Sequence, residues 1–520
     1  MTPWLTILGA VPLAGALVVS LVPAGRDLLA KQVALATSLV VLVLTVVLCV
    51  RFDPGGSRFQ FAQSYDWIRA FGVHYAVGVD GIALVLIALA AVLVPVVLLA
   101  SWDDVESLTS GGPDAPAAAR KSVKSFFALL LVLEAMMIGV FAATDVFLFY
   151  VFFESMLIPM YFLIGSYGGS RRSYAAVKFL LYSLAGGLLM LAAVIGLYVQ
   201  SAKTGTGTFS FEALTKLDLS HTTQAWLFLG FFIAFAIKAP LFPFHTWLPD
   251  AGAEAPTGSA VLLVGVLDKV GTFGFLRYCL PLFPWAAREF APYIVTLSVV
   301  GVLYGALLAM GQKDMKRLVS YTSVAHFGFI GMGCFAFTTQ AGTGAVLYMV
   351  NHGLSTGALF MVVGFLVNRG RSRLVSDYSG IAKVAPTLAA LFFVSGLSAL
   401  ALPGLSTFVS EFLVLVGSFQ RYTVATVFAT AGIILAALYV LLLYQRTMQG
   451  PLSGAHAAIK DLNVREVAAL APLIALMIFL GFYPKPLTDI ITPAVKATMQ
   501  DVGAHDPAPT DVAARAAESK

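Results

Sequence analysis

The stretch FAIKAPLFPFHTWLPD, residues 235–250, decides the fold of this chain. It begins inside a long apolar run that contains Lys238, and Pro240 and Pro243 then interrupt that run. Proline removes a backbone donor and clashes with the preceding helical turn, so a membrane helix is expected to break here. A lysine in the hydrocarbon region is costly unless it faces protein or water. The stretch therefore predicts a buried functional site inside a bundle of membrane helices.

The composition of the whole chain indicates an integral membrane protein. Of its 520 residues, 59% are apolar and 11% are charged, whereas soluble domains carry about 25% charged residues. The net charge of +5 is too small and too scattered to indicate nucleic-acid binding. The three cysteines lie far apart without metal-ligand spacing, so neither a metal nor a bound redox cofactor is expected on this chain.

Apolar runs of about 20 residues, the length that spans a bilayer, recur along the chain. They predict an all-α polytopic membrane protein with about fourteen transmembrane helices. The last residues, 485–520, alternate small and polar types and are expected to be poorly ordered. The predicted helices lie at residues 3–22, 31–50, 80–100, 125–143, 145–165, 175–199, 225–243, 258–280, 292–311, 318–337, 342–367, 388–417, 423–445 and 465–484.

Two predicted helices are interrupted, the seventh by Pro240 and Pro243 and the twelfth by Pro403 and Gly404. Discontinuous helices at matching positions point to inverted repeats with a site at their interface. Helices 4–8 and 9–13 are therefore expected to form two inverted five-helix repeats. The expected divisions are an N-terminal three-helix region, the two repeats, and a final helix with a short polar tail, at residues 1–124, 125–280, 281–447 and 448–520.

Basic residues mark the cytoplasmic loops of membrane proteins. Loops that follow odd-numbered helices carry most of the Lys and Arg residues, including the compact cluster Lys313–Arg317. This bias predicts that these loops are cytoplasmic and that both termini lie on the outer side. Every Lys and Arg is assigned to a loop or to the tail except Lys238 and Lys269.

Ionisable residues in separate apolar helices predict a proton relay. Each charge at mid-membrane costs about 2.5–3.5 kcal/mol, so opposite charges are expected to meet inside the bundle. Burial makes amines and carboxylates comparable in proton affinity, and histidine exchanges protons near neutrality. Hydroxyls such as those of Ser320, Thr322, Ser323 and Tyr348 could hold water between these groups. The candidate relay residues are Glu154, Lys238, Lys269, His326, His352 and Glu411.

Several of these residues also have a structural interpretation. His326 and His352 could simply hydrogen-bond across helices. Glu134, midway along the fourth helix, could be a structural partner or a secondary proton-path residue. His245, just after the break, could line a proton path or cap the irregular turn. The sequence does not fix the depth of Glu411 in the membrane.

Three strings make a family resemblance specific: residues 235–265 (FAIKAPLFPFHTWLPDAGAEAPTGSAVLLVG), 313–333 (KDMKRLVSYTSVAHFGFIGMG) and 402–412 (LPGLSTFVSEF). They resemble the antiporter-like subunits of respiratory complex I, specifically from about Leu129 to Glu411 and more loosely over the entire chain. By this resemblance, the six relay residues match the glutamate of the fifth helix, the lysines of the seventh and eighth, the histidines of the tenth and eleventh, and the acid of the twelfth. Most relatives carry lysine at that last position.

The resemblance implies a proton-translocating membrane-arm subunit of a multisubunit NADH:quinone oxidoreductase in a bacterial plasma membrane. FMN, iron–sulfur clusters and quinone would be bound by other subunits, and the partners would be lipid and membrane-arm neighbours of the L and N type. A multisubunit Na⁺/H⁺ antiporter subunit is the alternative, and a scaffold whose buried charges only fix helix register is a third interpretation.

Two positions depart from the family pattern. Gly252 stands where the family often has histidine, so a proton-uptake role at that site would be lost or moved. Asp268 precedes Lys269 where an apolar residue is more usual. Adjacent residues on a helix do not face each other, yet a nearby anion could still alter the proton affinity of the lysine.

Overall fold

The computed structural model describes residues 2–105, 122–452 and 457–507. Within these ranges, twelve helices are long and apolar enough to cross a membrane. They occupy twelve of the fourteen predicted positions, and the other two positions hold the interrupted helices at 225–243 and 388–417. The polytopic helical fold is therefore confirmed, and both predicted interruptions are present. The count of fourteen spans and the inverted arrangement of the repeats stay predictions.

The helices of the described residues follow one another with few extended segments. A π-helical stretch lies at each of Leu263–Leu267 and Phe275–Cys279. The α-helices are α1 (Trp4–Leu21), α2 (Asp27–Arg51), α3 (Gly81–Ala100), α5 (Val123–Ala142), α6 (Val146–Ser155), α7 (Leu157–Tyr167), α8 (Arg172–Thr204), α9 (Phe211–Leu214), α10 (His221–Lys238), α11 (Leu248–Glu254), α12 (Thr257–Leu262), α13 (Lys269–Gly274), α14 (Leu280–Leu282), α15 (Pro284–Met310), α16 (Met315–Phe335), α17 (Thr339–Gly370), α18 (Pro386–Ala399), α19 (Ser406–Phe419), α20 (Thr423–Met448), α21 (Val464–Phe482) and α22 (Lys485–Val502).

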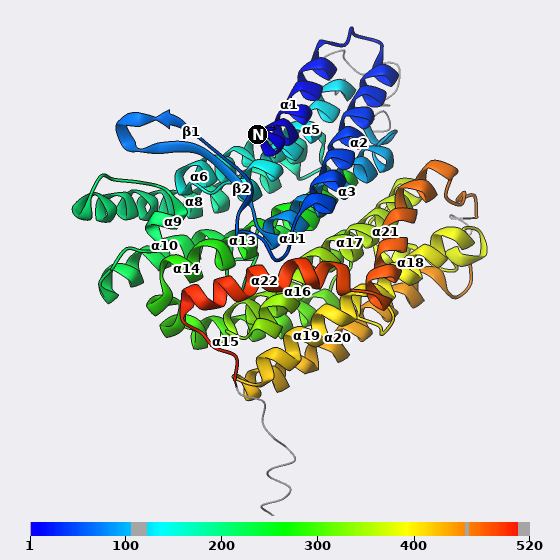
Figure 1. The fold of residues 1–520 in the computed structure, drawn as a ribbon. Coiled ribbons are helices and arrows are strands. Elements are labelled where there is room, and N and C mark those ends of the chain that lie inside the picture. Colours follow the sequence, from blue (N-terminus) through cyan, green and yellow to red (C-terminus); the bar gives the residue numbers. More distant parts are fainter. Residues whose placement is uncertain (1, 106–121, 453–456, 508–520) are drawn as a thin grey trace, which may run out of the picture.

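The core of the bundle contains the helices that carry most of the candidate relay residues. The span Thr257–Leu282 is buried throughout, and α16 and α17 are buried over nearly all of their length. By contrast, α1 and α2 form a pair that stands out from the rest beside α3 and α5 (Figure 1). A membrane helix surrounded by protein can hold polar side chains that lipid would not tolerate. The fold therefore keeps lysine and histidine away from lipid.

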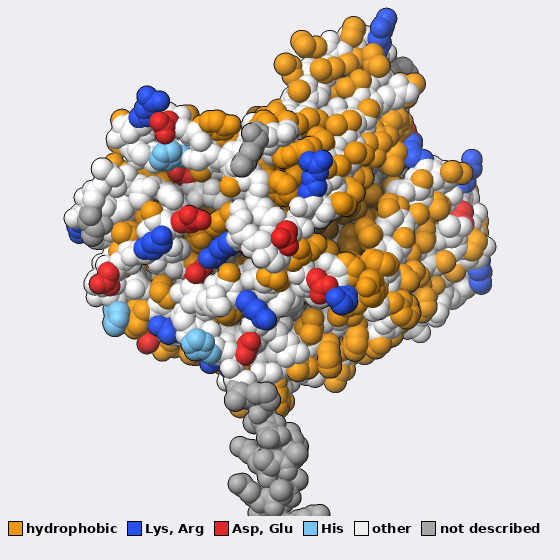
Figure 2. All heavy atoms as spheres, in the orientation of Figure 1, with side chains coloured by type: hydrophobic (Ala, Val, Ile, Leu, Met, Phe, Trp, Pro, Cys, Tyr) orange, Lys and Arg blue, Asp and Glu red, His pale blue; other side chains and the backbone are white. Residues whose placement is uncertain are grey.

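Lipid-facing surfaces are apolar, as expected for a membrane protein. Large apolar side chains such as Val43, Leu181 and Val427 are exposed on α2, α8 and α20. Figure 2 shows apolar side chains over the protruding α1 and α2 pair, whereas charged side chains gather toward the face with the β-hairpin and α22. This separation is consistent with a bundle whose sides contact acyl chains and whose ends contact water.

Two segments differ from the sequence expectation. Strands β1 (Gln60–Ile68) and β2 (Val73–Val79) form an antiparallel hairpin in a connection for which no strand was predicted. The prediction of poor order after residue 485 was wrong for residues 485–502, which form α22, whereas residues 508–520 lie outside the described part of the chain. Helix α22 buries Ile491, Val495 and Met499 on one face. Because these apolar residues are spaced by four, they form a stripe that packs on the bundle.

Two basic residues assigned to loops are buried. The Lys316 ammonium donates to the carbonyl of Ala255. The Arg277 guanidinium is 2% exposed and forms an ion pair with Asp80 at 2.7 Å. Asp80 also caps α3 by accepting from the backbone N–H of Ala83 at 2.9 Å. The assignment of these two residues to water-exposed loops was therefore wrong, because apolar length alone does not reveal how the flanking segments pack.

Candidate functional site

Lys238 is the last residue of α10, and proline chemistry explains why the helix ends there. Pro240 has no N–H for the carbonyl of Ala236, which accepts instead from Leu241 at 2.9 Å. The carbonyl of Ile237 then loses its usual donor and accepts from the indole Nε1 of Trp247 at 2.8 Å. The break thus satisfies its own backbone and leaves Lys238 at a helix C-terminus, where the dipole favours a cation.

Glu154 lies at a second break that a proline also determines. The ring of Pro159 clashes with the carbonyl four residues earlier, which is that of Ser155, and α6 ends at Ser155. Glu154 is therefore one residue from the end of its helix. Its carboxylate lies against Gly187 of α8, where a Cβ atom would overlap with Oε1.

The Lys238 ammonium is attracted by two carboxylates without a direct hydrogen bond to either. Its side chain is 1% exposed, and Nζ lies 4.9 Å from the ring centre of Phe153 and 5.7 Å from that of Phe179. The carboxylates close enough to attract it are Glu154 and Asp268. Among the described residues, Nζ has no hydrogen-bond partner. The predicted Glu154–Lys238 pair is therefore near but separated in this state.

Lys269 begins α13 directly after the first π-helical stretch. There the N–H of Asp268 donates to Leu263 at 3.2 Å, one residue further back than in an α-helix. The carbonyl of Val264 is thus left without that N–H and accepts from the Lys269 ammonium. Nζ also lies 2.7 Å from Nδ1 of His352 on α17. The π-helical stretch, a feature frequent at functional sites, orients the amine toward the histidine.

A line of polar groups continues from His352 to Glu411. The rings of His352 and His326 lie 5.2 Å apart, centre to centre. Nδ1 of His326 is 2.6 Å from the Tyr348 hydroxyl, which donates to Oε2 of Glu411 at 2.8 Å. Because the hydroxyl has one proton, this arrangement leaves its lone pairs to accept from His326. We call the set Lys269, His352, His326, Tyr348 and Glu411 the central line.

Glu411 is only 4% exposed because it lies on the buried face of α19, which packs on α17. Helix α18 ends at Ala399, four residues before Pro403, as the proline rule requires. Asn351 of α17 holds the beginning of α19 by donating to the carbonyl of Ser406 at 2.7 Å and to the Ser410 hydroxyl at 3.2 Å.

Two of the eight predicted site residues, Glu134 and His245, belong neither to the central line nor to the Glu154–Lys238 pair. Glu134 is fully buried in α5, and both of its carboxylate oxygens are without a hydrogen-bond partner in the described ranges. His245 lies in the break after α10, where its ring centre is 5.9 Å from that of Phe242 and 5.3 Å from that of Tyr304. The other six are buried or half-buried near the two breaks and along the central line. What each of the eight does stays a prediction.

The sequence indicated Tyr348 only as one of several hydroxyls, and it did not indicate Asn351. Tyr348 lies four residues before His352, so the two share a face of α17. That spacing was the available signal for Tyr348.

Gly252, where this chain departs from the family pattern, lies against the Ser320 hydroxyl, and a Cβ atom at position 252 would overlap with that hydroxyl. A larger side chain therefore does not fit at position 252 with Ser320 in this conformation.

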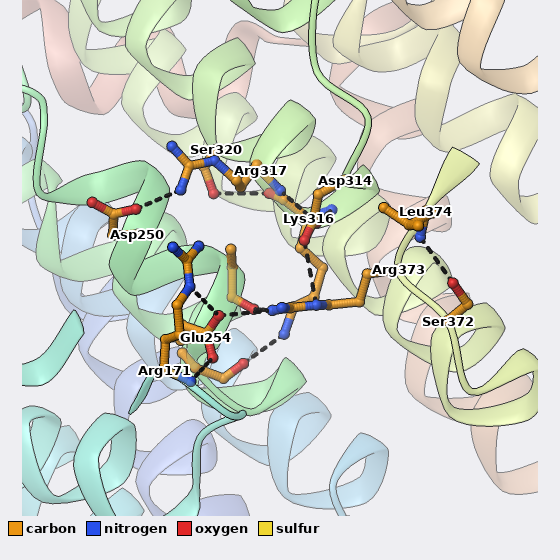
Figure 3. A network of polar contacts seen from close by, with 12 residues as sticks. Arg171, Asp250, Glu254, Asp314, Lys316, Arg317, Ser320, Ser372, Arg373 and Leu374 are labelled. Carbon is orange, nitrogen blue, oxygen red and sulfur yellow. Dashed lines mark hydrogen bonds and ion pairs between the residues drawn. The ribbon is translucent and has the colours of Figure 1, made fainter. Parts of the chain in front are cut away.

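Charged residues from four separate segments meet at one end of the bundle (Figure 3). Arg373 binds Glu254 at 3.1 Å and Asp314 at 3.3 Å. Asp250 pairs with Lys178 at 2.7 Å and with Arg317. The basic loops predicted to share one side of the membrane are thus in contact at one end of the bundle.

A cavity of about 270 Å³ lies at this end. Its lining includes Asp104, Glu254, Lys316, Asn368 and Arg373. Burial raises the pKa of Asp104 to about 6, against the opposing effects of a hydrogen bond from Asn368 and attraction to Lys316. This carboxyl group follows α3 outside the membrane spans, and its raised pKa lies closer to neutral pH than that of an exposed aspartate. Its sequence context did not indicate this behaviour.

Comparison with known proteins places the chain in one group. Residues 143–439 match the family model described as NADH:quinone oxidoreductase/Mrp antiporter, transmembrane. NADH-quinone oxidoreductase subunit M of Mycobacterium tuberculosis is 51% identical over 530 aligned residues, which cover 98% of this chain and 96% of the relative. A chain of respiratory complex I from Thermus thermophilus superposes with a TM-score of 0.85 at 30% identity, covering 96% of this chain and all of that one. A chain of the Mrp complex from Dietzia shares the fold, with a TM-score of 0.82 at 21% identity over 96% of this chain and all of that one.

Proposed function

The chain belongs to the NADH:quinone oxidoreductase/Mrp antiporter family of membrane proteins, and from this premise we propose that it translocates protons through a buried Glu/Lys/His relay. It would do so as a membrane-arm subunit of a multisubunit NADH:quinone oxidoreductase. Relatives of this subunit type are named as parts of that enzyme. FMN, iron–sulfur clusters and quinone would be carried by other subunits, and neighbours of the L and N type would flank this one.

The central line is the observation that best supports this function. Lys269, as an ammonium, can donate a proton to Nδ1 of His352 across 2.7 Å. At the other end, Tyr348 can give its proton to Glu411 while it takes one from His326, so the hydroxyl ends unchanged. Each transfer exchanges one proton between neighbouring groups and creates no extra charge along the line. A packing role for these residues would not require donors and acceptors in this order.

Three gaps separate the groups of the relay: Glu154 from Lys238, Lys238 from Lys269, and His352 from His326. Nζ of Lys238, Oε1 of Glu154 and Nε2 of both histidines are buried without a partner in the part of the chain that is described. In proteins such buried polar atoms are usually bridged by ordered water. We propose that water connects the relay at these gaps.

Protons would enter at the end with the charged cavity. The basic-residue rule assigns that end to the cytoplasm, and the pKa of Asp104 is raised toward neutral pH there. Quinone chemistry elsewhere in the complex would drive Lys238 away from Glu154, so that its proton moves through Lys269 to Glu411 and leaves on the outer side. Both termini would lie on that outer side of a bacterial plasma membrane.

Purification through a tag on this chain tests the proposal against the antiporter alternative. In mild detergent we expect it to bring down subunits with FMN and iron–sulfur absorbance, and the reconstituted complex should acidify vesicles when NADH is added. A Na⁺/H⁺ antiporter subunit would bring down only membrane partners and would exchange Na⁺ for protons without NADH. Recovery of such membrane partners alone would reject the assignment to an NADH:quinone oxidoreductase.

Gly187→Ala is expected to slow proton pumping without unfolding the chain. The new Cβ would overlap with the far end of the flexible Glu154 side chain, so the carboxylate must move while the backbone stays in place. A shift of about 1 Å in a reacting group can cost roughly 10²-fold in rate. The measurement is the initial pumping rate per NADH oxidised.

Gly196→Ala is the matched control for this substitution. It lies on the same helix, and its Cβ would meet only the flexible end of Leu227. It should pump at the wild-type rate. If both variants pump alike, the contact between Gly187 and Glu154 has no role in the relay.

A further inference from the structure

Asp268 is a buried carboxylate that none of the relay's transfers uses. It is fully buried, and neither carboxylate oxygen has a hydrogen-bond partner among the described residues. It lies at the end of the first π-helical stretch, immediately before α13. An ionised carboxylate in such surroundings is strongly destabilised unless a cation lies nearby. A purely structural acid would be expected to have hydrogen-bonded partners.

The packing of α13 on α10 places Asp268 on the side of its helix that meets the end of α10, where Lys238 lies. Gly271 lies so close to the end of α10 that an added Cβ would be 2.7 Å from Cβ of Ala239, the residue after Lys238. Asp268 is three residues before Gly271 and therefore lies on the same side of the helix. Lys269, one residue further round, points instead to His352 on α17. The carboxylate and the second lysine thus face different neighbours.

Asp268 is consequently within attractive range of both buried amines. Its carboxylate interacts electrostatically with Lys269 and with Lys238. Both lysines are at most 1% exposed, so water screens these attractions little. An acid between two amines can take a proton from one and give it to the other. Such a transfer would connect Lys238 to Lys269. Without it, only water would carry the proton between these two lysines.

We propose that Asp268 is a proton-carrying site that links Lys238 to Lys269. The Lys238 ammonium gives a proton to the carboxylate, leaving a neutral amine and a neutral acid. The acid then protonates the Lys269 amine and returns to a carboxylate. One proton crosses from α10 to α13 and no other bond changes. This inference rests on the proposed function, since it gives one step of that relay a named carrier.

The surroundings of Asp268 include few other ionisable groups. Helix α3, which packs against this stretch, carries no ionisable side chain between residues 81 and 100. Titratable groups on the other elements that pack against this region include Lys238 on α10, Glu134 on α5, His326 on α16 and His352 on α17, together with Arg277 and Tyr278 on the second π-helical stretch. Of these groups, Lys238 is the one that attracts the Asp268 carboxylate appreciably. The adjacent Lys269 attracts it as well.

The test uses the assembled complex in proteoliposomes with three variants. Asp268→Asn keeps the shape but cannot carry a proton, Asp268→Leu removes the polar group, and Asp268→Glu retains a carboxyl group. Proton pumping per NADH oxidised should fall at least about tenfold in Asp268→Asn and Asp268→Leu. Removing a positioned acid–base group usually costs roughly 10²–10⁴-fold. The loss expected here is smaller because water can carry part of the proton flow. The glutamate variant should recover most of it.

The pH profile separates a proton carrier from a structural residue. Without the anion, the two ammonium groups lose an attraction that stabilises them, so the high-pH decline of pumping in Asp268→Asn should move to lower pH. Thr272→Val is the control on the same helix, because among the described residues the Thr272 hydroxyl bonds only the carbonyl of Lys269. It should keep the wild-type profile. A wild-type rate and profile in Asp268→Asn would overturn the inference. The proposed function fails separately, by normal pumping in Lys238→Ala.

Discussion

Lys238→Ala is expected to abolish NADH-driven proton pumping through this subunit while the chain still folds and assembles. Among the described residues, this amine is the one ionisable group that both Glu154 and Asp268 attract. Its removal leaves the two acids without a shared proton donor. A positioned acid–base group contributes roughly 10²–10⁴-fold to proton transfer. Because the ammonium has no hydrogen-bond partner in the described ranges, its loss breaks no structural hydrogen bond.

The measurement is vesicle acidification divided by NADH oxidation, with the amount of assembled complex as a reference. Lys238→Arg sharpens it, because arginine keeps the positive charge but does not release a proton. If proton exchange matters, the arginine variant should also fail to pump; if only charge matters, it should pump normally. Lys203→Ala, at the exposed end of α8, is the control. Normal pumping by the assembled Lys238→Ala complex would contradict the relay. It would favour the scaffold interpretation, in which buried charges only fix helix register.

Asp80→Ala is expected to destabilise the folded chain strongly. It leaves the Arg277 guanidinium, 2% exposed, without its ion-pair partner. Breaking a buried pair from one side costs about 3–5 kcal/mol, and losing the N-cap of α3 adds about 1 kcal/mol. The rings of Phe59 and Phe273, at 4.8 and 5.1 Å from the guanidinium carbon, stabilise the cation only in part.

Thermal unfolding of the detergent-solubilised complex, followed by loss of this chain from it, measures the effect. Asp489→Ala is the matched control, since the Lys485–Asp489 pair is 65% and 55% exposed and exposed pairs contribute about 0–1 kcal/mol. The double variant Asp80→Leu with Arg277→Met should regain much of the loss, because an apolar pair of similar volume replaces a buried ion pair at little cost. An unchanged unfolding temperature in Asp80→Ala would show that Arg277 is stabilised by its surroundings alone.

Three helix breaks illustrate what could be predicted from local sequence. Helices α6 and α18 end at the residue four before Pro159 and Pro403, and α10 ends two residues after Ala236, which is four before Pro240. That rule depends only on the chain's own backbone, since the proline ring meets the carbonyl four residues earlier. The interruptions of the seventh and twelfth helices were therefore predicted, and with them the place of Lys238 beside a break. The break beside Glu154 was not, because the fifth helix was predicted to be continuous over residues 145–165.

Contacts between helices could not be predicted in the same way. The sequence contained Lys269, His352, Tyr348 and Glu411 but not their order, because which faces meet depends on crossing geometry that distant residues determine. The burial of Arg277 was missed for a related reason. Its partner Asp80 is nearly two hundred residues earlier, and nothing local to either residue indicates the pair.

The sequence by itself determined the membrane class, the positions of the helices and the points where they break, because lipid imposes an apolar length and proline imposes a break on any chain. It also determined that Lys238 and Lys269 lie within apolar runs. Only the tertiary structure decided which groups these amines contact, that Tyr348 joins His326 to Glu411, and that Asp268 is attracted by both lysines. Those contacts span up to about a hundred residues, and side chains so far apart in sequence meet only through the packing of the whole bundle.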